Sequence, residues 1–153
     1  MAENGDSPMV EMLLGRIVIR DRDERQYIFL SERGGKRGFP IVIGTNEAAE
    51  IHRVVAGIEY ERPMTHQLCY SAIQALGAEV RRCDIVDLRQ NTFFAQLVLQ
   101  SAQGDTTAVI DARPSDAIAL ALRARCPIRV AEHVLEQVRS DESGPDPLPR
   151  AEE

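Results

Sequence analysis

The chain has 153 residues, 44% of them apolar and 27% charged, which is ordinary for one globular domain with a single core. No apolar run reaches the roughly 18 residues of a membrane span, and the acidic N-terminus argues against a signal peptide. We therefore expect a cytoplasmic protein with no membrane partner. The net charge of −6 argues against a nucleic-acid binder, but residues 1–8 and 139–153 supply most of it; the rest carries −1.

Residues 9–77 form the first half of the predicted domain. Three strands are predicted there, at residues 12–20, 26–31 and 39–43. Two helices follow. Thr45 is the expected N-cap of the first and Gly57 its stop, while Thr65 and Gly77 bound the second. The apolar face expected for the second helix consists of Leu68, Cys69, Ala72, Ile73 and Leu76.

Residues 78–138 repeat this order of elements. Strands are predicted at residues 78–88, 92–101 and 106–111, helices at 114–125 and 131–138, and a short extended link at 127–130. The matching order predicts an α+β fold in which duplicated three-strand, two-helix units form one compact domain with two short sheets. Residues 1–8 and 139–153 are predicted to be disordered, the latter as an acidic tail, because they cannot bury apolar surface.

The junction between the strand ending near Ile110 and the helix beginning at Pro114 gathers several polar residues. Proline is well tolerated at the first helical position, since that N–H has no helical partner. Asp116 then lies in the first turn, where an acid faces the positive end of the helix dipole. The strand end presents Asp111, and the helix start presents Arg113 and Ser115.

Three carboxylates are candidate ligands for a divalent metal, either Mg²⁺ or Mn²⁺. Asp111 and Asp116 come from one junction, and Glu47 occupies the matching junction of the first half. Phosphodiester hydrolysis commonly uses metals held by such acids. The alternative is structural: Asp116 and Glu47 compensate helix dipoles, and Asp111 makes an ion pair or hydrogen bonds at the strand end.

His66, at a helix start, is a candidate general base, or a phosphate ligand when charged, and Arg62 lies four residues before it. The alternative for His66 is a ring packed at the helix start and bonded to a carbonyl. Arg113 could bind a phosphate, or it could pair with Asp111 or Asp116 to stiffen the junction. The three cysteines lack a C-x-x-C pair, so we expect buried, reduced thiols.

Four segments carry a family resemblance, namely residues 39–44 with 47–48, residues 62–66, residues 92–95, and the Arg-Pro-Ser-Asp-Ala run within residues 110–117. Together they resemble the bifunctional nuclease family over about residues 9–138. The resemblance implies an α+β domain of two similar halves and a nuclease activity on RNA and DNA. The site residues would then cluster where the halves meet.

The resulting hypothesis is a nuclease that hydrolyses phosphodiester bonds of RNA or DNA with the assistance of a metal. The residues assigned to catalysis are Asp111, Asp116 and His66. The residues assigned to substrate binding are Arg113, Ser115 and Arg62. The alternative is a non-enzymatic module that binds a ligand or protein and uses the Arg-Pro-Ser-Asp-Ala segment structurally. Because the adjacent Val98 and Leu99 place apolar side chains on both strand faces, we also expect a homo-oligomer, most simply a dimer.

Overall fold

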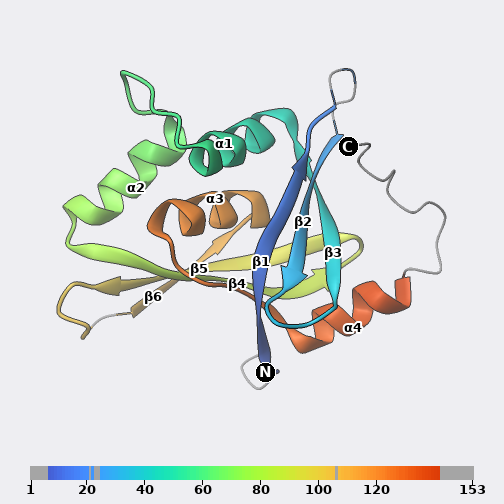
Figure 1. Ribbon diagram of the computed structural model, residues 1–153. Coiled ribbons are helices and arrows are strands. Elements are labelled where there is room, and N and C mark those ends of the chain that lie inside the picture. Colours follow the sequence, from blue (N-terminus) through green and yellow to red (C-terminus); the bar gives the residue numbers. More distant parts are fainter. Residues whose placement is uncertain (1–6, 21, 23–24, 106, 142–153) are drawn as a thin grey trace.

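The computed structural model describes residues 7–20, 22, 25–105 and 107–141, and this part of the chain forms an α+β fold of seven strands and four helices (Figure 1). The strands are β1 Met9–Val18, β2 Arg25–Glu32, β3 Gly38–Gly44, β4 Ala78–Arg89, β5 Thr92–Ser101, β6 Thr107–Ala112 and β7 Ile128–Ala131. The helices are α1 Thr45–Ala56, α2 Thr65–Ala75, α3 Pro114–Ala124 and α4 Glu132–Asp141.

All the described strands belong to one sheet, in the order β3-β2-β1-β7-β4-β5-β6. The short strand β7 completes it, running antiparallel to β1 and parallel to β4. The prediction of two short sheets was therefore wrong, because the segment expected as a link is a strand. Each half does contain a three-stranded antiparallel meander. That the halves are copies of one unit stays a prediction.

The helices cover the sheet unequally. Helices α1, α2 and α3 lie on one side, where α3 packs against β4, β5 and α1 (Figure 1). Helix α4 lies on the other side, against β3, β4 and β7. The core between them is aliphatic, as the low aromatic content predicts, and Phe39 stacks on Phe93 with their ring centroids 5.4 Å apart. None of the described helices has the length and apolarity needed to cross a bilayer.

Two of the predicted helix caps were wrong by one residue. Helix α1 begins at Thr45 itself and α2 begins at Thr65, so the N-caps are Gly44 and Met64, neither of which makes a side-chain capping bond. The predicted stop at Gly57 is confirmed, with φ of 69° in the left-handed region that glycine adopts without strain. Helix boundaries of this kind are uncertain in a sequence because a threonine fits both positions.

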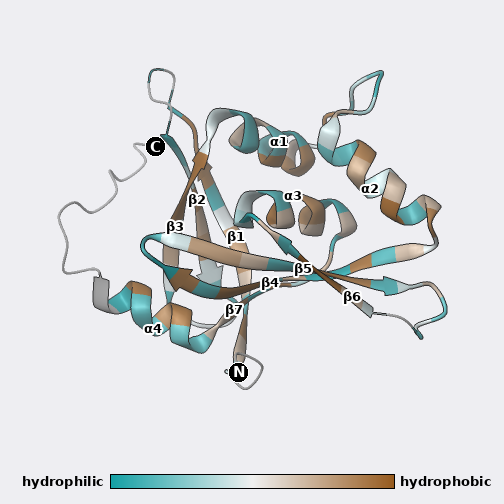
Figure 2. Cartoon of the chain, turned by 180° about the vertical axis from the view of Figure 1, so that it is seen from behind, coloured by the Kyte–Doolittle hydropathy of each residue, from teal (hydrophilic) through white to brown (hydrophobic). Residues whose placement is uncertain are grey.

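The apolar face predicted for α2 is only partly covered, with Ile73 half-buried against the core. No residue of α2 is buried, and the exposed fractions of Leu68 and of the adjoining Leu76 are 60% and 87%. Cys69 is exposed as well, which corrects the expectation of three buried thiols; Cys83 is buried and Cys126 half-buried. The edge strand β6 is similarly exposed and apolar, and Figure 2 shows hydrophobic segments on both α2 and β6.

The predicted disordered segments fall largely on residues 1–6 and 142–153, which lie outside the described residues. Within the described part, α4 continues to Asp141, three residues beyond its predicted end. At the other end, the carbonyl of Pro8 accepts a hydrogen bond of 2.8 Å from the backbone N–H of Glu132. The residues just before β1 are thus bonded to the start of α4.

Candidate functional site

The β6–α3 junction positions a polar group at the start of α3. Arg113 is the N-cap, with extended backbone at φ −67° and ψ 145°, as expected for a residue before proline. Pro114 opens the helix, and Asp116 lies in its first turn. Ser115, Ala117 and Ile118 are buried, so the helix start is fixed against the sheet while Arg113 and Asp116 point away from the core.

Four side chains from three helix starts meet at this junction. The Nε2 atom of His66 lies 2.8 Å from Asp116 Oδ1. Arg113 donates to the same carboxylate, from Nε to Oδ2 at 2.8 Å and from Nη2 to Oδ1 at 3.1 Å. Its Nη1 also lies 3.2 Å from Glu47 Oε1. His66, Asp116, Arg113 and Glu47 are called the junction cluster below.

The starts of α1, α2 and α3 converge on the junction cluster. Glu47 is in the first turn of α1, Asp116 is in the first turn of α3, and His66 is the second residue of α2. Helix N-termini carry partial positive charge and favour anions nearby. At the start of α1, a side chain on Gly44 would overlap the carboxylate of Glu47, so glycine at this position leaves the room that Glu47 occupies.

The charges of the junction cluster stabilise one another. Burial works to raise the pKa of Asp116, but the hydrogen bonds from Arg113 and His66 outweigh it and hold that pKa below its usual value. The pKa of Arg113 is raised, chiefly by its bonds to Asp116. Asp116 is therefore ionised near neutral pH. An ionised carboxylate only accepts hydrogen bonds, so Nε2 of His66 carries the proton that it donates.

This arrangement leaves the other ring nitrogen of His66 available. Nδ1 makes no hydrogen bond to the residues that the structure describes, and the side chain is partly exposed. A neutral imidazole whose Nε2–H is held by a carboxylate presents a bare Nδ1, which can accept a proton. The pair His66–Asp116 thus has the geometry of an oriented general base.

The other predicted site residues do not join the cluster. Asp111 is exposed on β6, opposite Gln96, and has no hydrogen bond or ion pair among the described residues. Arg62 is exposed in the loop between α1 and α2 and is likewise without a partner in the described part. Ser115 is 7% exposed and lines the groove described next, without reaching His66 or Asp116.

A groove of about 870 Å³ begins at Arg113 and follows β3, and we call it the β3 groove. The rest of its lining is Arg25, Pro40, Ile41, Val42, Ile43, Gly44, Glu47, Leu88, Asn91, Thr92, Phe93, Pro114, Ser115 and Val138. Neither His66 nor Asp116 lines it. Arg113 is the residue that both touches Asp116 and lines the groove, so it joins the junction cluster to the available volume.

The predicted metal ligands do not fit a divalent ion as they are arranged. Asp116 and Glu47 are both bonded to Arg113, and Asp111 stands apart on β6. Among the described residues, no group of three or more His, Cys, Asp or Glu side chains could hold a metal. A cation binding between Glu47 and Asp116 would have to displace the guanidinium.

Sequence reasoning missed a buried ion network that holds α1 to α3. Glu50 contacts Arg53 and accepts a hydrogen bond of 3.1 Å from Arg123, and both Glu50 and Arg53 are buried. The signal in the sequence was the Glu50–Arg53 spacing of three on a helical pattern. The network fixes the two helices whose first turns carry Glu47 and Asp116.

The fold and the junction cluster define an α+β protein with an oriented histidine at a sheet-to-helix junction. The family model of the bifunctional nuclease domain matches residues 28–143, and the chain belongs to this family. The uncharacterized protein Rv1829 of Mycobacterium tuberculosis is 40% identical over 129 residues, covering 84% of this chain and 76% of that protein.

Two plant relatives are more distant. Bifunctional nuclease 1 of Arabidopsis thaliana is 28% identical over 96 residues, covering 62% of this chain and 30% of the plant protein. Bifunctional nuclease 2 of Oryza sativa subsp. japonica is 26% identical over 117 residues, covering 76% of this chain and 36% of that protein. The chain thus spans about a third of the length of each of these two nucleases.

Proposed function

We propose that the protein hydrolyses phosphodiester bonds of RNA or DNA at the junction cluster. The observation that carries the proposal is the bonded chain His66–Asp116–Arg113, found at the sheet-to-helix junction of a bifunctional nuclease family member. A histidine oriented by a carboxylate supplies a base, and an exposed guanidinium supplies a phosphate ligand. These are two requirements of phosphoryl transfer.

Each residue has a distinct role in this proposal. His66 Nδ1 takes a proton from the attacking group, either water or the ribose 2′-OH of RNA, as its oxygen bonds the phosphorus and the bond from phosphorus to the leaving oxygen breaks. The imidazolium then returns a proton to the leaving oxygen. Attack by the 2′-OH leaves a 2′,3′-cyclic phosphate, which water opens in a second step. Asp116 holds the ring in the tautomer that makes the proton transfer possible and stabilises the imidazolium that forms. Arg113, 64% exposed, contacts the phosphate and stabilises the negative charge that grows on its oxygens. Glu47 positions Arg113 at 3.2 Å.

The residues outside the cluster keep their assignments as predictions. Asp111 remains a proposed catalytic residue, and Ser115 and Arg62 remain proposed substrate ligands. Involvement of Mg²⁺ or Mn²⁺ also stays a prediction, and no step of the proposed mechanism is assigned to a metal, because Arg113 occupies the carboxylates. Dialysis against a chelator followed by metal add-back measures it, and unchanged cleavage after chelation would contradict the predicted requirement.

The test of the proposed function is a matched pair of histidine variants. Purified wild type, His66→Ala and His52→Ala are assayed on single-stranded RNA and DNA. His52 is exposed on α1 and lies outside the cluster. We expect His66→Ala to lower the cleavage rate about a hundredfold or more, and His52→Ala to leave it unchanged. Equal cleavage by all three preparations would indicate a contaminating nuclease and defeat the assignment.

One observation favours a second candidate, a non-enzymatic binding module. The charges of the cluster are mutually paired, as a structural staple would require, with Arg113 bound to both Asp116 and Glu47. In that function the β3 groove would bind its ligand without cleaving it. Retained binding of a single strand with no cleavage by wild type would support the module over the enzyme.

Exposed apolar residues on β6 and α2 offer a surface for self-association. Val109 and Ile110 are exposed on the edge strand β6, and Leu68 is exposed on α2. An exposed apolar edge strand offers unpaired backbone groups to another strand. The other edge, β3, carries Pro40, which reduces pairing there. We propose a two-fold dimer in which the β6 strands of two copies pair.

A further inference from the structure

A second hollow continues the β3 groove at the far end of the strand. It has a volume of about 410 Å³ and is lined by Lys36, Arg37, Gly38, Leu135, Val138 and Arg139. Val138 lines both hollows, so they meet at this residue. We call the second one the distal hollow. The two follow β3 in sequence, the distal hollow at Gly38 and the β3 groove from Pro40 to Gly44.

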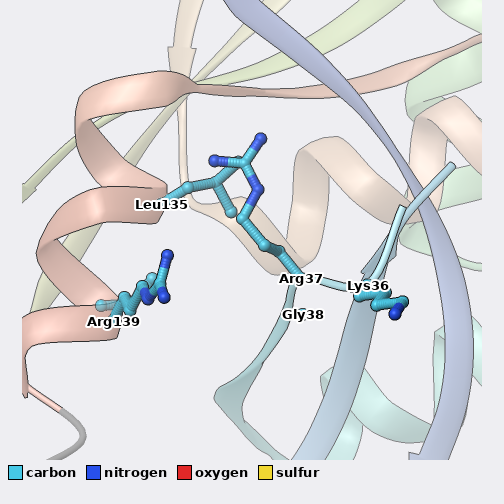
Figure 3. Close-up of a pocket in the computed structure, with 6 residues that line it drawn as sticks. Lys36, Arg37, Gly38, Leu135 and Arg139 are labelled. Atoms are coloured by element: carbon cyan, nitrogen blue, oxygen red, sulfur yellow. The ribbon is translucent and has the colours of Figure 1, made fainter. Parts of the chain in front are cut away.

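The cations of the distal hollow come from two elements. Figure 3 shows Lys36 and Arg37 on the β2–β3 turn and Arg139 on α4, with Leu135 beside them. Arg37 is already occupied, since it bonds Glu32 at 2.9 Å and Glu132 at 2.5 Å. Those bonds raise its pKa and tie the turn to α4. Arg37 therefore builds the wall of the hollow.

Lys36 and Arg139 are different, because both are exposed and neither has a hydrogen bond or ion pair with any described residue. Figure 3 shows Lys36 and Arg139 on opposite sides of Arg37, so each offers its own cation, without a bonded carboxylate among the described residues, to an anion at the hollow. The apolar floor at Leu135 and Val138 excludes water from one side of the site. The distal hollow is therefore suited to an anionic group.

The charge along both hollows is strongly asymmetric. Their lining contains five cationic side chains but a single carboxylate, that of Glu47, in a chain whose net charge is −6. The cationic side chains are Lys36, Arg37, Arg139, Arg25 and Arg113. We call the two hollows together the track. Arg37 and Arg113 are each paired with two carboxylates, so the cations that attract a polyanion to this negative protein are chiefly Lys36 and Arg139 at the distal end.

The shape of the track indicates which polyanion it fits. From Gly38 to Gly44 the strand covers roughly 20 Å at about 3.3 Å per residue. Between the two charged ends the lining is mainly apolar, including Pro40, Val42 and Phe93, with the polar Asn91 and Thr92 beside them. Such a surface contacts unstacked bases, as single-strand binders do, and offers nothing to the bases of a duplex, which are hidden in the stack.

We infer that the distal hollow is a subsite that binds phosphates of single-stranded RNA or DNA, which lies along β3 with one phosphate at Arg113 and one each at Lys36 and Arg139. The inference rests on the proposed function for its substrate class. The protein would then also bind the nucleic-acid strand several nucleotides away from the scissile bond. Short substrates therefore use the junction cluster alone, and longer ones use both ends of the track.

The test compares a long and a short substrate with the double variant Lys36→Ala/Arg139→Ala. Anisotropy titrations with a labelled single strand of about 12 nucleotides use the His66→Ala background, so that the strand stays intact. We expect about tenfold weaker binding and a salt dependence whose log–log slope flattens by about 1.4, the value for two lost phosphate contacts on a single strand. Cleavage of a dinucleotide by Lys36→Ala/Arg139→Ala with His66 intact should not change.

The matched control is Arg16→Ala/Arg81→Ala, which removes the same charge from exposed residues that line neither hollow. Equal weakening in the control, an unchanged salt slope, or equally tight binding of a duplex would overturn the subsite. Thermal midpoints verify that all variants fold. If wild type cleaves nothing but the double variant still loses strand affinity with the flattened slope, the proposed nuclease activity fails while the subsite stands. If wild type cleaves through His66 and strand affinity is unaffected, the subsite alone fails.

Discussion

The guanidinium of Arg113 lies 3.2 Å from the carboxylate of Glu47, so the β6–α3 junction is tied to the first turn of α1. The same guanidinium binds Asp116 through two nitrogens. A planar guanidinium with several donors can serve two carboxylates at once, whereas an ammonium is a single point of charge. The contacts of Arg113 therefore depend on the planar shape of its side chain as well as on its positive charge.

Arg113→Lys should keep the fold and lose most of the activity. Because the side chain of Arg113 is 64% exposed, we expect the free energy of unfolding to change by about 1 kcal/mol or less. Lysine cannot hold Asp116, Glu47 and a phosphate in one plane, so the cleavage rate should fall about a hundredfold. Arg33→Lys is the control, since Arg33 is equally exposed and pairs with Glu11. A cleavage rate that Arg113→Lys leaves intact would remove Arg113 from the proposed mechanism.

Asp111→Asn separates chemistry from structure at the strand end. Asp111 is exposed and has no partner among the described residues, so we expect the free energy of unfolding to stay within about 0.5 kcal/mol of wild type. If Asp111 is catalytic, as the sequence predicts, the variant loses cleavage at full stability. The measurement is the cleavage rate beside that of Asp116→Asn, together with both thermal midpoints. Full activity in Asp111→Asn would withdraw this residue from the site.

Asp84 should be a structural acid with a measurable pH signature. Its side chain is 7% exposed and is bound by Arg129 at 2.8 Å and by Arg82 at 2.9 Å. Asp84→Asn should lower the free energy of unfolding by about 2 kcal/mol, less than for a fully buried pair because both arginines reach solvent. Asp87→Asn, on the same strand and in a more exposed pair, should cost less. Chemical denaturation of the three proteins at neutral pH measures both differences.

The pH dependence follows from the pKa of Asp84. Burial acts to raise this pKa, but the bonds from Arg129 and Arg82 outweigh it, so the folded value lies below the usual 3.8. A depressed pKa gives a stabilisation that is present above the unfolded value and is lost as pH falls through the folded value. The stability gap between wild type and Asp84→Asn should be constant near neutrality and shrink below about pH 4. A gap that widened in acid would contradict the assigned direction.

The proposed dimer is tested at the edge of the sheet. Val109→Lys places a charge on β6, where it should block pairing with a second copy while leaving the fold intact. Light scattering should give a dimer mass for wild type and a monomer mass for the variant. Val55→Lys, at a similarly exposed valine on α1, should remain dimeric. A monomer mass for wild type at all concentrations would contradict the proposed dimer.

Most of the strands could be predicted from the sequence because each is an apolar run that ends at a turn residue. The prediction failed at β7, which has only four residues, three of them buried between neighbouring strands, so no alternation marks it. It also overestimated the burial of α2, where Ile73 is half-buried against the core but Leu68 and the adjoining Leu76 stay exposed. The spacing of apolar residues identifies the apolar face of a helix, but only the tertiary packing determines what covers that face.

The candidate site was predicted in part for a related reason. Asp116 and His66 were found because each stands at a helix start, and Arg113 because it precedes a proline at such a start. Their mutual distances depend on how α1, α2 and α3 converge, which no local pattern encodes. Asp111 was grouped with them because it is near in sequence, although it sits on the exposed edge strand.

The position of β7 also has a consequence for how the chain reaches its native state. This strand is the only link between the two meanders in the described sheet, and it comes late in the sequence. A nascent chain that stops before residue 128 leaves the sides of β1 and β4 that face β7 without a partner. The halves should therefore acquire stability together, in one cooperative step near the end of synthesis, and a fragment of residues 9–77 alone should not fold.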